Sequence, residues 1–163
     1  MVDKTEDIEY KIANKNDIPR LVTMRIGYIE CDQGEISASN MEKMRVQMPA
    51  YFEKHLNKDI IVFTARSSGK IVSVAMLLII EKPANPNFIN GRVGEVLSVY
   101  TLEEFQHRGI ATVLMNQLVQ YSRENKIDRI DLAATDDGYG VYKKIGFKDK
   151  TNEYKEMRYV ISN

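Results

Sequence analysis

The 163-residue sequence lacks several features that mark whole classes of protein. Its single cysteine, Cys31, excludes a disulfide within the chain and a zinc site built from several cysteines. No stretch approaches the ~18 consecutive apolar residues of a membrane-spanning helix. The first residues also lack the apolar core of a secretory signal. We therefore expect a chain that does not enter a membrane and that works in the reducing cytoplasm.

The sequence has no excess of charge of either sign, because 23 Lys and Arg balance 23 Asp and Glu. Nucleic-acid-binding domains usually carry a clear cationic excess, so this balance argues against a nucleic-acid partner. Hydrophobic residues make up 44% of the chain and charged residues 28%, an ordinary globular composition that argues against disorder. Because no linker-like stretch interrupts the sequence, we expect one domain over residues 1–163.

Hydrophobic periodicity predicts strands and helices in a mixed order. Strands are predicted over residues 8–13, 92–101 and 127–135, with β-hairpins over 59–82 and 147–161. Helices are predicted over residues 16–31, from 39 or 40 onwards, over 108–125 and over 138–145. Asn16 or Asp17 is expected to cap the first helix, and Pro49 is expected to break or kink the second. This order of elements predicts a mixed sheet with helices on its faces, an α/β fold in the broad sense.

The turn between the strand over 92–101 and the helix that follows has features of an anion site. Gly109 lets the backbone take an unusual φ and approach a ligand closely, and the small Ala111 keeps that approach open. The unpaired N–H groups of a first helical turn, together with the helix dipole, bind anions such as a pyrophosphate. Thr112 could add a hydroxyl, and His107 or Arg108 a positive charge. On these residues alone, a plain strand-to-helix turn is an equally good interpretation.

Two motifs in this half of the chain resemble those of the GNAT superfamily of acetyl-CoA-dependent N-acetyltransferases. The segment Gln106-His-Arg-Gly109-Ile-Ala111 is similar to the family's pyrophosphate loop, Arg/Gln-x-x-Gly-x-Gly/Ala. Downstream, LAATDDGYGVYKKIGF is similar to a second element, in which a strand ending in a small polar residue, a short helix and Tyr-x-x-x-Gly-Phe follow one another. The first half of the chain matches the family only in its order of elements. The resemblance implies a GNAT fold, with a mostly antiparallel mixed sheet, a splayed central pair of strands and helices on both faces.

The resemblance also implies that acetyl-CoA is the acetyl donor and that no metal takes part. The pyrophosphate would lie on the loop formed by Gln106, His107, Arg108, Gly109, Ile110, Ala111 and Thr112. The pantetheine arm would pair with the backbone of Val99 and Thr101, with Tyr100 between them, and Thr135 and Tyr142 would also contact the cofactor. Arginine is commoner than glutamine at the position of Gln106, so we expect a modest loss of CoA affinity.

Three residues are assigned catalytic roles by the same resemblance. The N–H of Val99 would polarise the thioester carbonyl, and Tyr142 would give a proton to the departing thiolate. Glu95 would act as general base, since it has the spacing to Gly109 of the base in the histone-modifying branch. Glu95 and Val99 are four residues apart on one strand, so we expect them on one face, about 13 Å apart. The alternatives are a core aromatic at Tyr142, and at Glu95 a strand-end carboxylate that is exposed or paired with Arg92.

We therefore expect an enzyme that moves the acetyl group of acetyl-CoA to the primary amine of a small molecule, by direct attack in a ternary complex. A protein acceptor, through a lysine or an N-terminal amine, and a non-catalytic acyl-CoA sensor are the alternatives. The acceptor would enter beside the first two helices, where the stripe of Met41, Met44 and Met48 either packs in the core or lines a pliable pocket. Family members often dimerise, so a homodimer is also expected.

Overall fold

A computed structural model describes residues 7–151 and 153–161 of the chain. These residues fall into two compact units, one ending at Ala133 and the other beginning at Ala134, and each is described by itself. The first unit contains the whole sheet and helices α1 to α3, and the second contains helix α4. That the chain forms one domain stays a prediction.

The first unit is built on a five-stranded sheet in the order β1-β2-β3-β4-β5. Its strands are β1 (Ile8–Ile12), β2 (Ile60–Ser67), β3 (Lys70–Glu81), β4 (Arg92–Thr101) and β5 (Arg129–Asp131). The pairs from β1 to β4 are antiparallel, whereas β4 and β5 are parallel and pair only where Val93, Gly94 and Glu95 face β5. Beyond Glu95, β4 and β5 separate. The mixed, mostly antiparallel sheet with a splayed pair is therefore confirmed.

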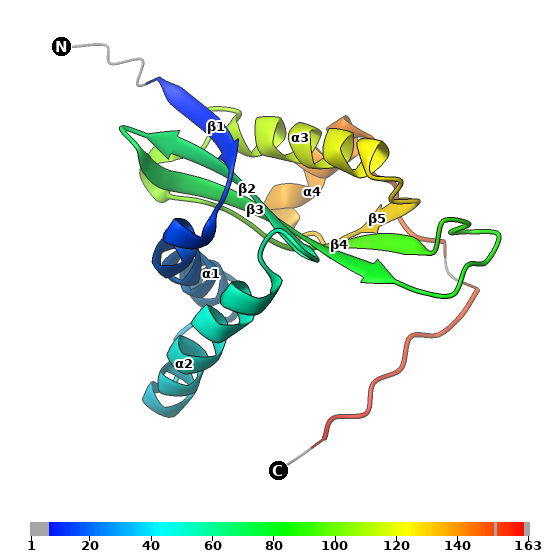
Figure 1. The fold of residues 1–163 in the computed structure, drawn as a ribbon, viewed down its shortest axis with the longest axis horizontal. Coiled ribbons are helices and arrows are strands. Elements are labelled where there is room, and N and C mark those ends of the chain that lie inside the picture. Colours follow the sequence, from blue (N-terminus) through cyan, green and yellow to red (C-terminus); the bar gives the residue numbers. More distant parts are fainter. Residues whose placement is uncertain (1–6, 152, 162–163) are drawn as a thin grey trace. The chain divides into compact units, whose positions relative to one another are not determined.

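Helices cover both faces of this sheet (Figure 1). The helical elements are η1 (Lys15–Asp17), α1 (Ile18–Gln33), α2 (Ala38–His55), η2 (Glu103–Phe105) and α3 (Ile110–Glu124). Helices α1 and α2 lie on one face, and α3 lies on the other (Figure 1). On the α1 face, Leu21 and Met24 pack with Val62 and Met76 in one buried cluster. On the α3 face, the ring of Phe63 meets that of Tyr121 edge to face, with centroids 5.6 Å apart.

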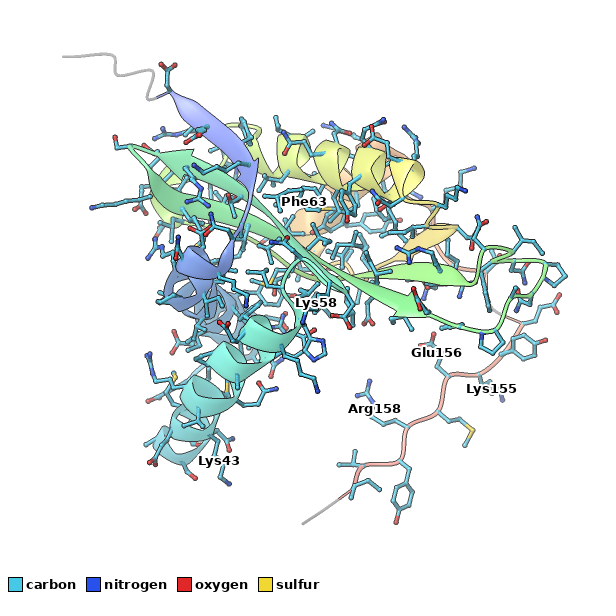
Figure 2. All side chains as sticks on the ribbon, viewed as in Figure 1. Lys43, Lys58, Phe63, Lys155, Glu156 and Arg158 are labelled. Carbon is cyan, nitrogen blue, oxygen red and sulfur yellow. The ribbon has the colours of Figure 1, made fainter. Side chains whose placement is uncertain are left out.

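Figure 2 shows Phe63 between the sheet and α3, in the layer where Leu114, Met115 and Leu118 are fully buried. The amphipathic helix predicted over 108–125 is thus present, and its apolar side faces the sheet.

The predicted hairpin over 59–82 is present as β2 and β3. Its turn uses Ser68 and Gly69, whose φ angles are 49° and 77°. Two successive residues with positive φ match the right-handed twist of the strands that they join, which is why a glycine serves well there. This turn sets the pairing of Ser67 with Lys70, and a β-bulge at Val72 then shifts the register by one residue, so that Phe63 lies opposite Ala75.

Two expectations about the first two helices are corrected in detail. Asp17 is the N-cap residue of α1, as expected, but its side chain makes no capping hydrogen bond to that helix. Asn14 caps the preceding turn, η1, because its side chain accepts a hydrogen bond from Asn16 N. Helix α2 begins after Ser37 and runs through Pro49 without a break. A proline removes one helical hydrogen bond. The helix continues here because its buried residues lie on both sides of the proline, at Met48 and Phe52.

The second unit contains helix α4 (Asp136–Ile145), which has well-formed ends. Thr135 caps its start by accepting from Gly138 N at 3.3 Å. Gly146 ends it with a φ of 119°, in the left-handed region that favours glycine, and its N–H bonds to Tyr142 O and Lys143 O. The short helix predicted over 138–145 is confirmed with one more half-turn at its start.

The closing hairpin predicted over 147–161 is wrong for the described residues, which exclude Asn152. Neither residues 147–151 nor residues 153–161 form a strand. Asp149 instead turns back to α4, where its carboxylate accepts from the hydroxyl of Tyr139 at 2.9 Å and from Lys143 at 3.2 Å. Half of the described residues of this stretch are charged and all but Phe147 are exposed. A two-stranded hairpin without a packed face is marginal in water. The strand predicted over 127–135 is also shorter, as β5 spans only three residues.

Candidate active site

The end of β4 presents backbone groups that the sheet does not use. Leu102 N donates to Val72 O at 2.9 Å, beyond the last ladder pair, Ser73 with Thr101. Hydrogen-bonded and non-bonded pairs alternate in an antiparallel ladder, so Val99 and Thr101 direct their N–H and C=O groups away from β3. β5 has already separated from β4 at that point. The backbone of Val99 and Thr101 therefore faces the gap between the splayed strands.

Gln106 ties the following loop back to this strand. Its side-chain Nε2 donates to Thr101 O at 3.1 Å. This bond requires the Thr101 carbonyl to point away from β3, as the alternation of the ladder also does. A carbonyl oxygen has two lone pairs, so Thr101 can accept from a second donor as well. Gln106 thus fixes the loop at its start, a role that its position in the motif alone did not predict.

The turn before α3 has the geometry of an anion site. Gly109 is the N-cap of α3, with φ 75° and ψ 6°, and no side chain caps the helix. The N–H groups of Ile110, Ala111 and Thr112 occupy the first helical turn, where a helix has no partners of its own for them. A Cβ built on Gly109 would meet no atom within 4 Å, so space is open beside the turn. Ile110 is buried and anchors the helix start to the sheet.

The two basic residues of the loop differ in how they are held. Arg108 Nη2 donates to Glu104 O at 2.7 Å, and its guanidinium lies 5.0 Å from the centre of the Phe105 ring. Its side chain is thus bound to its own loop. His107 is exposed and has a φ of 60°, which keeps the backbone in the tight left-handed turn before Gly109.

The expected relation between Glu95 and Val99 is wrong, because β4 contains a β-bulge. Met76 pairs with Ser98 and the next residue, Leu77, pairs with Val96, so Leu97 is an extra residue on β4. An extra residue shifts the alternation of side chains by one position. Glu95 therefore shares a face with Ser98 and Tyr100, whereas Val99 points to the opposite face.

The face that carries Glu95 is the one covered by α1. Tyr100 on this face lies so close to α1 that a Cβ on Gly27 would come within 2.9 Å of its ring. Burial raises the pKa of Tyr100, and the neighbouring Cys31 raises it further. Glu95 itself is exposed, and within the described residues it has no ion pair, because Arg92 pairs with Glu81 at 2.9 Å. A carboxylate at Glu95 is therefore available to solvent on the α1 side of β4.

In the second unit, Tyr142 is half-buried on α4. Its ring lies 6.0 Å from that of Phe147 in an edge-to-face arrangement. A Cβ on Gly138 would come within 2.8 Å of a Tyr142 ring carbon, so the glycine makes room for the tyrosine one turn away. The Tyr-x-x-x-Gly-Phe motif thus forms one local packing unit, and Thr135 caps the same helix.

A residue that the sequence reasoning missed lies between α1 and β4. Arg25 Nη1 donates to Leu97 O at 2.8 Å and to the hydroxyl of Ser98, both at the bulge. The signal was present, because Arg25 is seven residues after Ile18 and four after Leu21, on the apolar side of α1. A charged residue on a core-facing stripe indicates a special role.

Two cavities open on the same face of the sheet. One, of about 280 Å³, is lined by Arg25, Gln47, Met48, Tyr51, Phe52, Ile60, Met76 and Leu97. The other, of about 240 Å³, includes Met41, Glu30, Arg45 and Tyr100 in its walls. Two residues of the methionine stripe therefore line pockets, and Met48 is at the same time part of the buried core.

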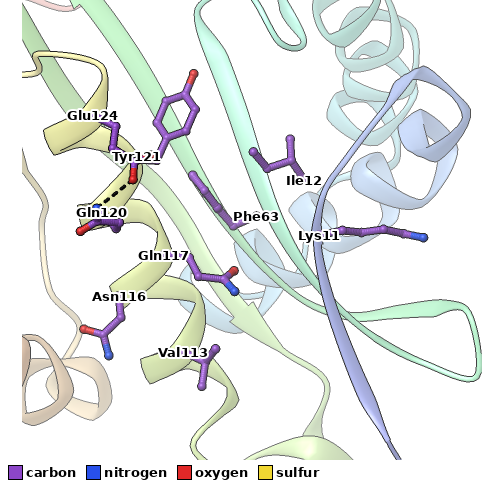
Figure 3. A pocket seen from close by; sticks show the side chains of 9 residues that line it. All are labelled: Lys11, Ile12, Phe63, Val113, Asn116, Gln117, Gln120, Tyr121 and Glu124. Atoms are coloured by element: carbon purple, nitrogen blue, oxygen red, sulfur yellow. Dashed lines mark hydrogen bonds between the residues drawn. The ribbon is translucent and has the colours of Figure 1, made fainter.

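A third cavity, of about 530 Å³, lies on the α3 face between β1, β2 and α3 (Figure 3). Phe63 and Tyr121 line it from β2 and α3, and Gln117 and Gln120 add amide groups from α3. It contains none of the residues predicted to bind or act on a substrate. We therefore place the candidate site at the end of β4 and the start of α3.

Within the part of the chain that the structure describes, no group of three or more His, Cys, Asp or Glu side chains could hold a metal ion. No helix among the described residues is long and apolar enough to cross a membrane.

Several solved structures similar to this chain are described as acetyltransferases. A predicted acetyltransferase from Clostridium acetobutylicum, crystallised with acetyl-CoA, is 30% identical, with a TM-score of 0.80 over 93% of this chain and 96% of that one. An aminoglycoside acetyltransferase from an uncultured soil metagenomic sample has a TM-score of 0.67 at 16% identity, covering 95% and 97% of the two chains. A ribosomal-protein-alanine N-acetyltransferase from Brucella melitensis biovar Abortus 2308 has the same TM-score and identity, covering 94% and 100%.

No curated protein matches the chain significantly. The model of the acetyltransferase (GNAT) family, however, matches residues 27–147, which include both motifs and the whole of β4 and α3. Together with the similarity to the clostridial protein, this match is decisive. The chain belongs to the GNAT family of acetyltransferases.

Proposed function

We propose that the protein transfers the acetyl group of acetyl-CoA to the primary amine of a small molecule, by direct attack in a ternary complex. The observation that carries this proposal is the combination of two features. The backbone edge of β4 at Val99 and Thr101 is not used by the sheet, and the helix start at Gly109 has no side-chain cap. The first suits an extended amide-containing arm, and the second suits a pyrophosphate. Acetyl-CoA contains both groups.

Acetyl-CoA would supply an acetyl group that is activated as a thioester. The N–H groups of Ile110, Ala111 and Thr112 would bind the pyrophosphate, with Gly109 allowing its close approach. Val99 N–H would donate to the thioester carbonyl oxygen, where negative charge develops as the amine attacks. One such donor typically lowers a barrier by about 3–4 kcal/mol.

Two further groups would move protons. A primary amine with a pKa near 10 is mostly protonated at neutral pH, so it must lose a proton before it attacks. Glu95 would accept that proton through water, as an exposed carboxylate on the face of β4 that α1 covers. Tyr142 would donate the hydroxyl proton to the departing sulfur as the carbon–sulfur bond breaks. The carbon–nitrogen bond forms in the same sequence, and no covalent intermediate with the protein is needed.

The class of acceptor is supported by the size of the cavities beside α1. Both are close to or below the ~300 Å³ at which ligand pockets usually begin, so they suit a small amine. The aminoglycoside acetyltransferase among the similar structures is named for a small-molecule acceptor, whereas the ribosomal-protein-alanine enzyme is named for a protein. A protein acceptor is therefore the second candidate. A homodimer stays a prediction.

The test combines titration calorimetry of acetyl-CoA with a thiol-release assay against a panel of amines. Binding together with release in the presence of one class of small amine supports the proposal. Binding with release only in the presence of peptides ending in a free amine or containing lysine would favour the protein acceptor. Binding without release on any amine would favour a sensor, and the absence of binding would contradict the assignment of the loop.

A further inference from the structure

Arg25 is a partly buried cation that has no anionic partner among residues 7–151 and 153–161. Its guanidinium lies under α1 against β4, and burial lowers the pKa of the group. Within the described residues no carboxylate forms an ion pair with it, and its only hydrogen bonds run from Nη1 to Leu97 O and the Ser98 hydroxyl. Buried arginines are normally paired with a carboxylate, because an unpaired buried charge costs free energy.

Arg66 in the same unit shows the normal arrangement. Arg66 is buried more fully than Arg25, and its Nη1 and Nη2 donate to the two carboxylate oxygens of Asp17 at 2.9 and 2.7 Å. Such a bidentate ion pair matches the planar geometry of the guanidinium. In Arg25, Nε and Nη2 donate to nothing within the described residues. Nε and Nη2 of Arg25 are thus the two donors that would bind a carboxylate.

These donors lie beside a cavity. Arg25 lines the space of about 280 Å³, together with Gln47 and Tyr51 as polar groups and Met48, Phe52 and Met76 as apolar ones. Such a wall suits a small molecule that has one anionic end and an apolar body.

The cavity also adjoins the reacting centre proposed above. Leu97, which accepts from Arg25, is two residues from Glu95 and two from Val99 along β4. Two residues of strand span about 7 Å. A carboxylate at Arg25 would therefore place an amine that is a few bonds away near both the proposed base and the thioester.

From this arrangement we infer that the acceptor amine carries a carboxylate, which Arg25 binds, so that the substrate class is the amino acids and related small amino carboxylates. This inference rests on the proposed function, because it names the acceptor of that reaction. Arg25 is a specificity residue that recognises the anionic end, while the amine is directed towards β4.

The first experiment needs only the unaltered protein. Thiol release from acetyl-CoA is compared for amino acids and for the amines that lack only their carboxylate, such as leucine with isopentylamine and ornithine with putrescine. We expect kcat/KM to be about 100-fold higher for the carboxylate-bearing member of at least one pair, because the amine without a carboxylate cannot form the bidentate, charge-assisted hydrogen bonds to Arg25.

The second experiment separates recognition from a merely structural role. In Arg25→Met the preference for the carboxylate-bearing acceptor should fall to within about 3-fold, while the KM for acetyl-CoA stays the same. Arg25→Lys keeps the charge without the planar guanidinium and should retain part of the preference. Arg20→Met is the matched control, since Arg20 lies on the same helix and donates to a backbone carbonyl, Ile71 O, at 2.9 Å. It should keep the full preference.

The outcomes are distinct. Equal or faster turnover of the amines without a carboxylate overturns the inference but leaves the proposed function intact. Loss of turnover for both members of each pair by the same factor in Arg25→Met assigns Arg25 to holding the bulge and also overturns it. If no tested amine, with or without a carboxylate, gives thiol release, both the proposed function and the inference are contradicted. If Arg25→Met does not fold, the comparison within the unaltered protein decides.

Discussion

The two sides of β4 are built in different ways. On the side proposed for acetyl-CoA, the binding groups belong to the backbone: the free edge at Val99 and Thr101, and the helix start after Gly109. On the side covered by α1, the groups proposed for the acceptor belong to side chains, namely Arg25, Glu95 and the walls of the adjoining cavity. A backbone site needs only small residues at set positions, whereas a side-chain site depends on how helices pack.

If acetyl-CoA and the acceptor bind as proposed, the cofactor side uses groups that every residue possesses, whereas the acceptor side uses groups that a single substitution can change. Each side should therefore respond to mutation in its own way, and this can be tested from the largest expected effect to the smallest.

The backbone side should be most sensitive at Gly109. Gly109→Asp forces a side chain onto a residue with a φ of 75° and places negative charge at the helix start, where a pyrophosphate would lie. We expect acetyl-CoA affinity to fall at least about 100-fold by calorimetry. Gly69→Asp is the control, because Gly69 has a similar φ of 77° and equally open surroundings, but lies in the β2–β3 turn. Equal losses in both variants would mean that backbone strain alone is responsible.

Tyr142 should affect turnover rather than binding. Tyr142→Phe removes the proposed proton donor to the thiolate, and we expect kcat to fall about 10- to 100-fold with the KM for acetyl-CoA nearly unchanged. The loss is limited because a CoA thiolate is already a fair leaving group. Tyr139→Phe on the same helix removes a hydroxyl that bonds to Asp149 at 2.9 Å and should leave kcat unaltered. Full activity in Tyr142→Phe would assign the tyrosine to packing against Phe147.

On the side-chain face, Glu95→Gln should change the pH dependence of turnover. If Glu95 takes the amine proton through water, the variant should lose about 10-fold in kcat/KM at neutral pH and recover at high pH, where the free amine predominates. Steady-state rates from pH 6 to 10 measure this. Glu103→Gln, on the exposed η2 turn, serves as the control. A constant ratio of variant to unaltered rates across the range would argue against a base at this position.

The smallest effect on turnover is expected where α1 is anchored. Asp17→Asn leaves Arg66 buried without its carboxylate partner and should lower the free energy of unfolding by about 3 kcal/mol, with little change in the KM for acetyl-CoA. Glu53→Gln removes an exposed ion pair to Lys15 and should cost less than about 0.5 kcal/mol. Denaturant unfolding of the two variants measures both.

The pH dependence of this effect has a definite sign. The hydrogen bond to Arg66 holds the pKa of Asp17 below its ordinary value of 3.8. A carboxyl with a depressed pKa in the folded state stabilises the fold above its ordinary value, and this contribution is lost as the pH falls through the lower, folded value. The stability gap between Asp17→Asn and the unaltered protein should therefore shrink below pH 3.8. A gap that grows in acid would contradict the assignment.

Much of the fold could be predicted from periodicity. The hairpin of β2 and β3, the strand β4 and the helix α3 lie close to the predicted residues, because their apolar patterns are long and end in turn residues. The errors occur where a tertiary contact prevails over a local rule. The burial of Met48 and Phe52 carries α2 through Pro49. The bond of Asp149 to α4 turns the chain back where a strand was predicted.

In the candidate site, too, features with a local sequence signal could be predicted, whereas features that depend on tertiary contacts could not. The motif around Gly109 identified its turn correctly, because positive φ and small residues leave a mark in the sequence. The relation of Glu95 to Val99 could not be derived by counting, since a bulge at Leu97 carries no glycine to reveal it. Arg25 was overlooked for a related reason, as its importance depends on which carbonyl lies opposite it.

The bulge at Leu97 also has a consequence for how such a chain can diverge. The two surfaces of β4 carry different residues, as in any strand, and the additional residue sets which of them belong to which surface beyond the bulge. A substitution on one surface therefore need not change the other. Substitutions along α1 and α2 could thus redirect the enzyme to a new amine while the machinery for the acetyl donor stays untouched. A deletion of one residue within β4 would exchange the two surfaces over half of the strand. Length in this segment should therefore be far less free to vary than identity.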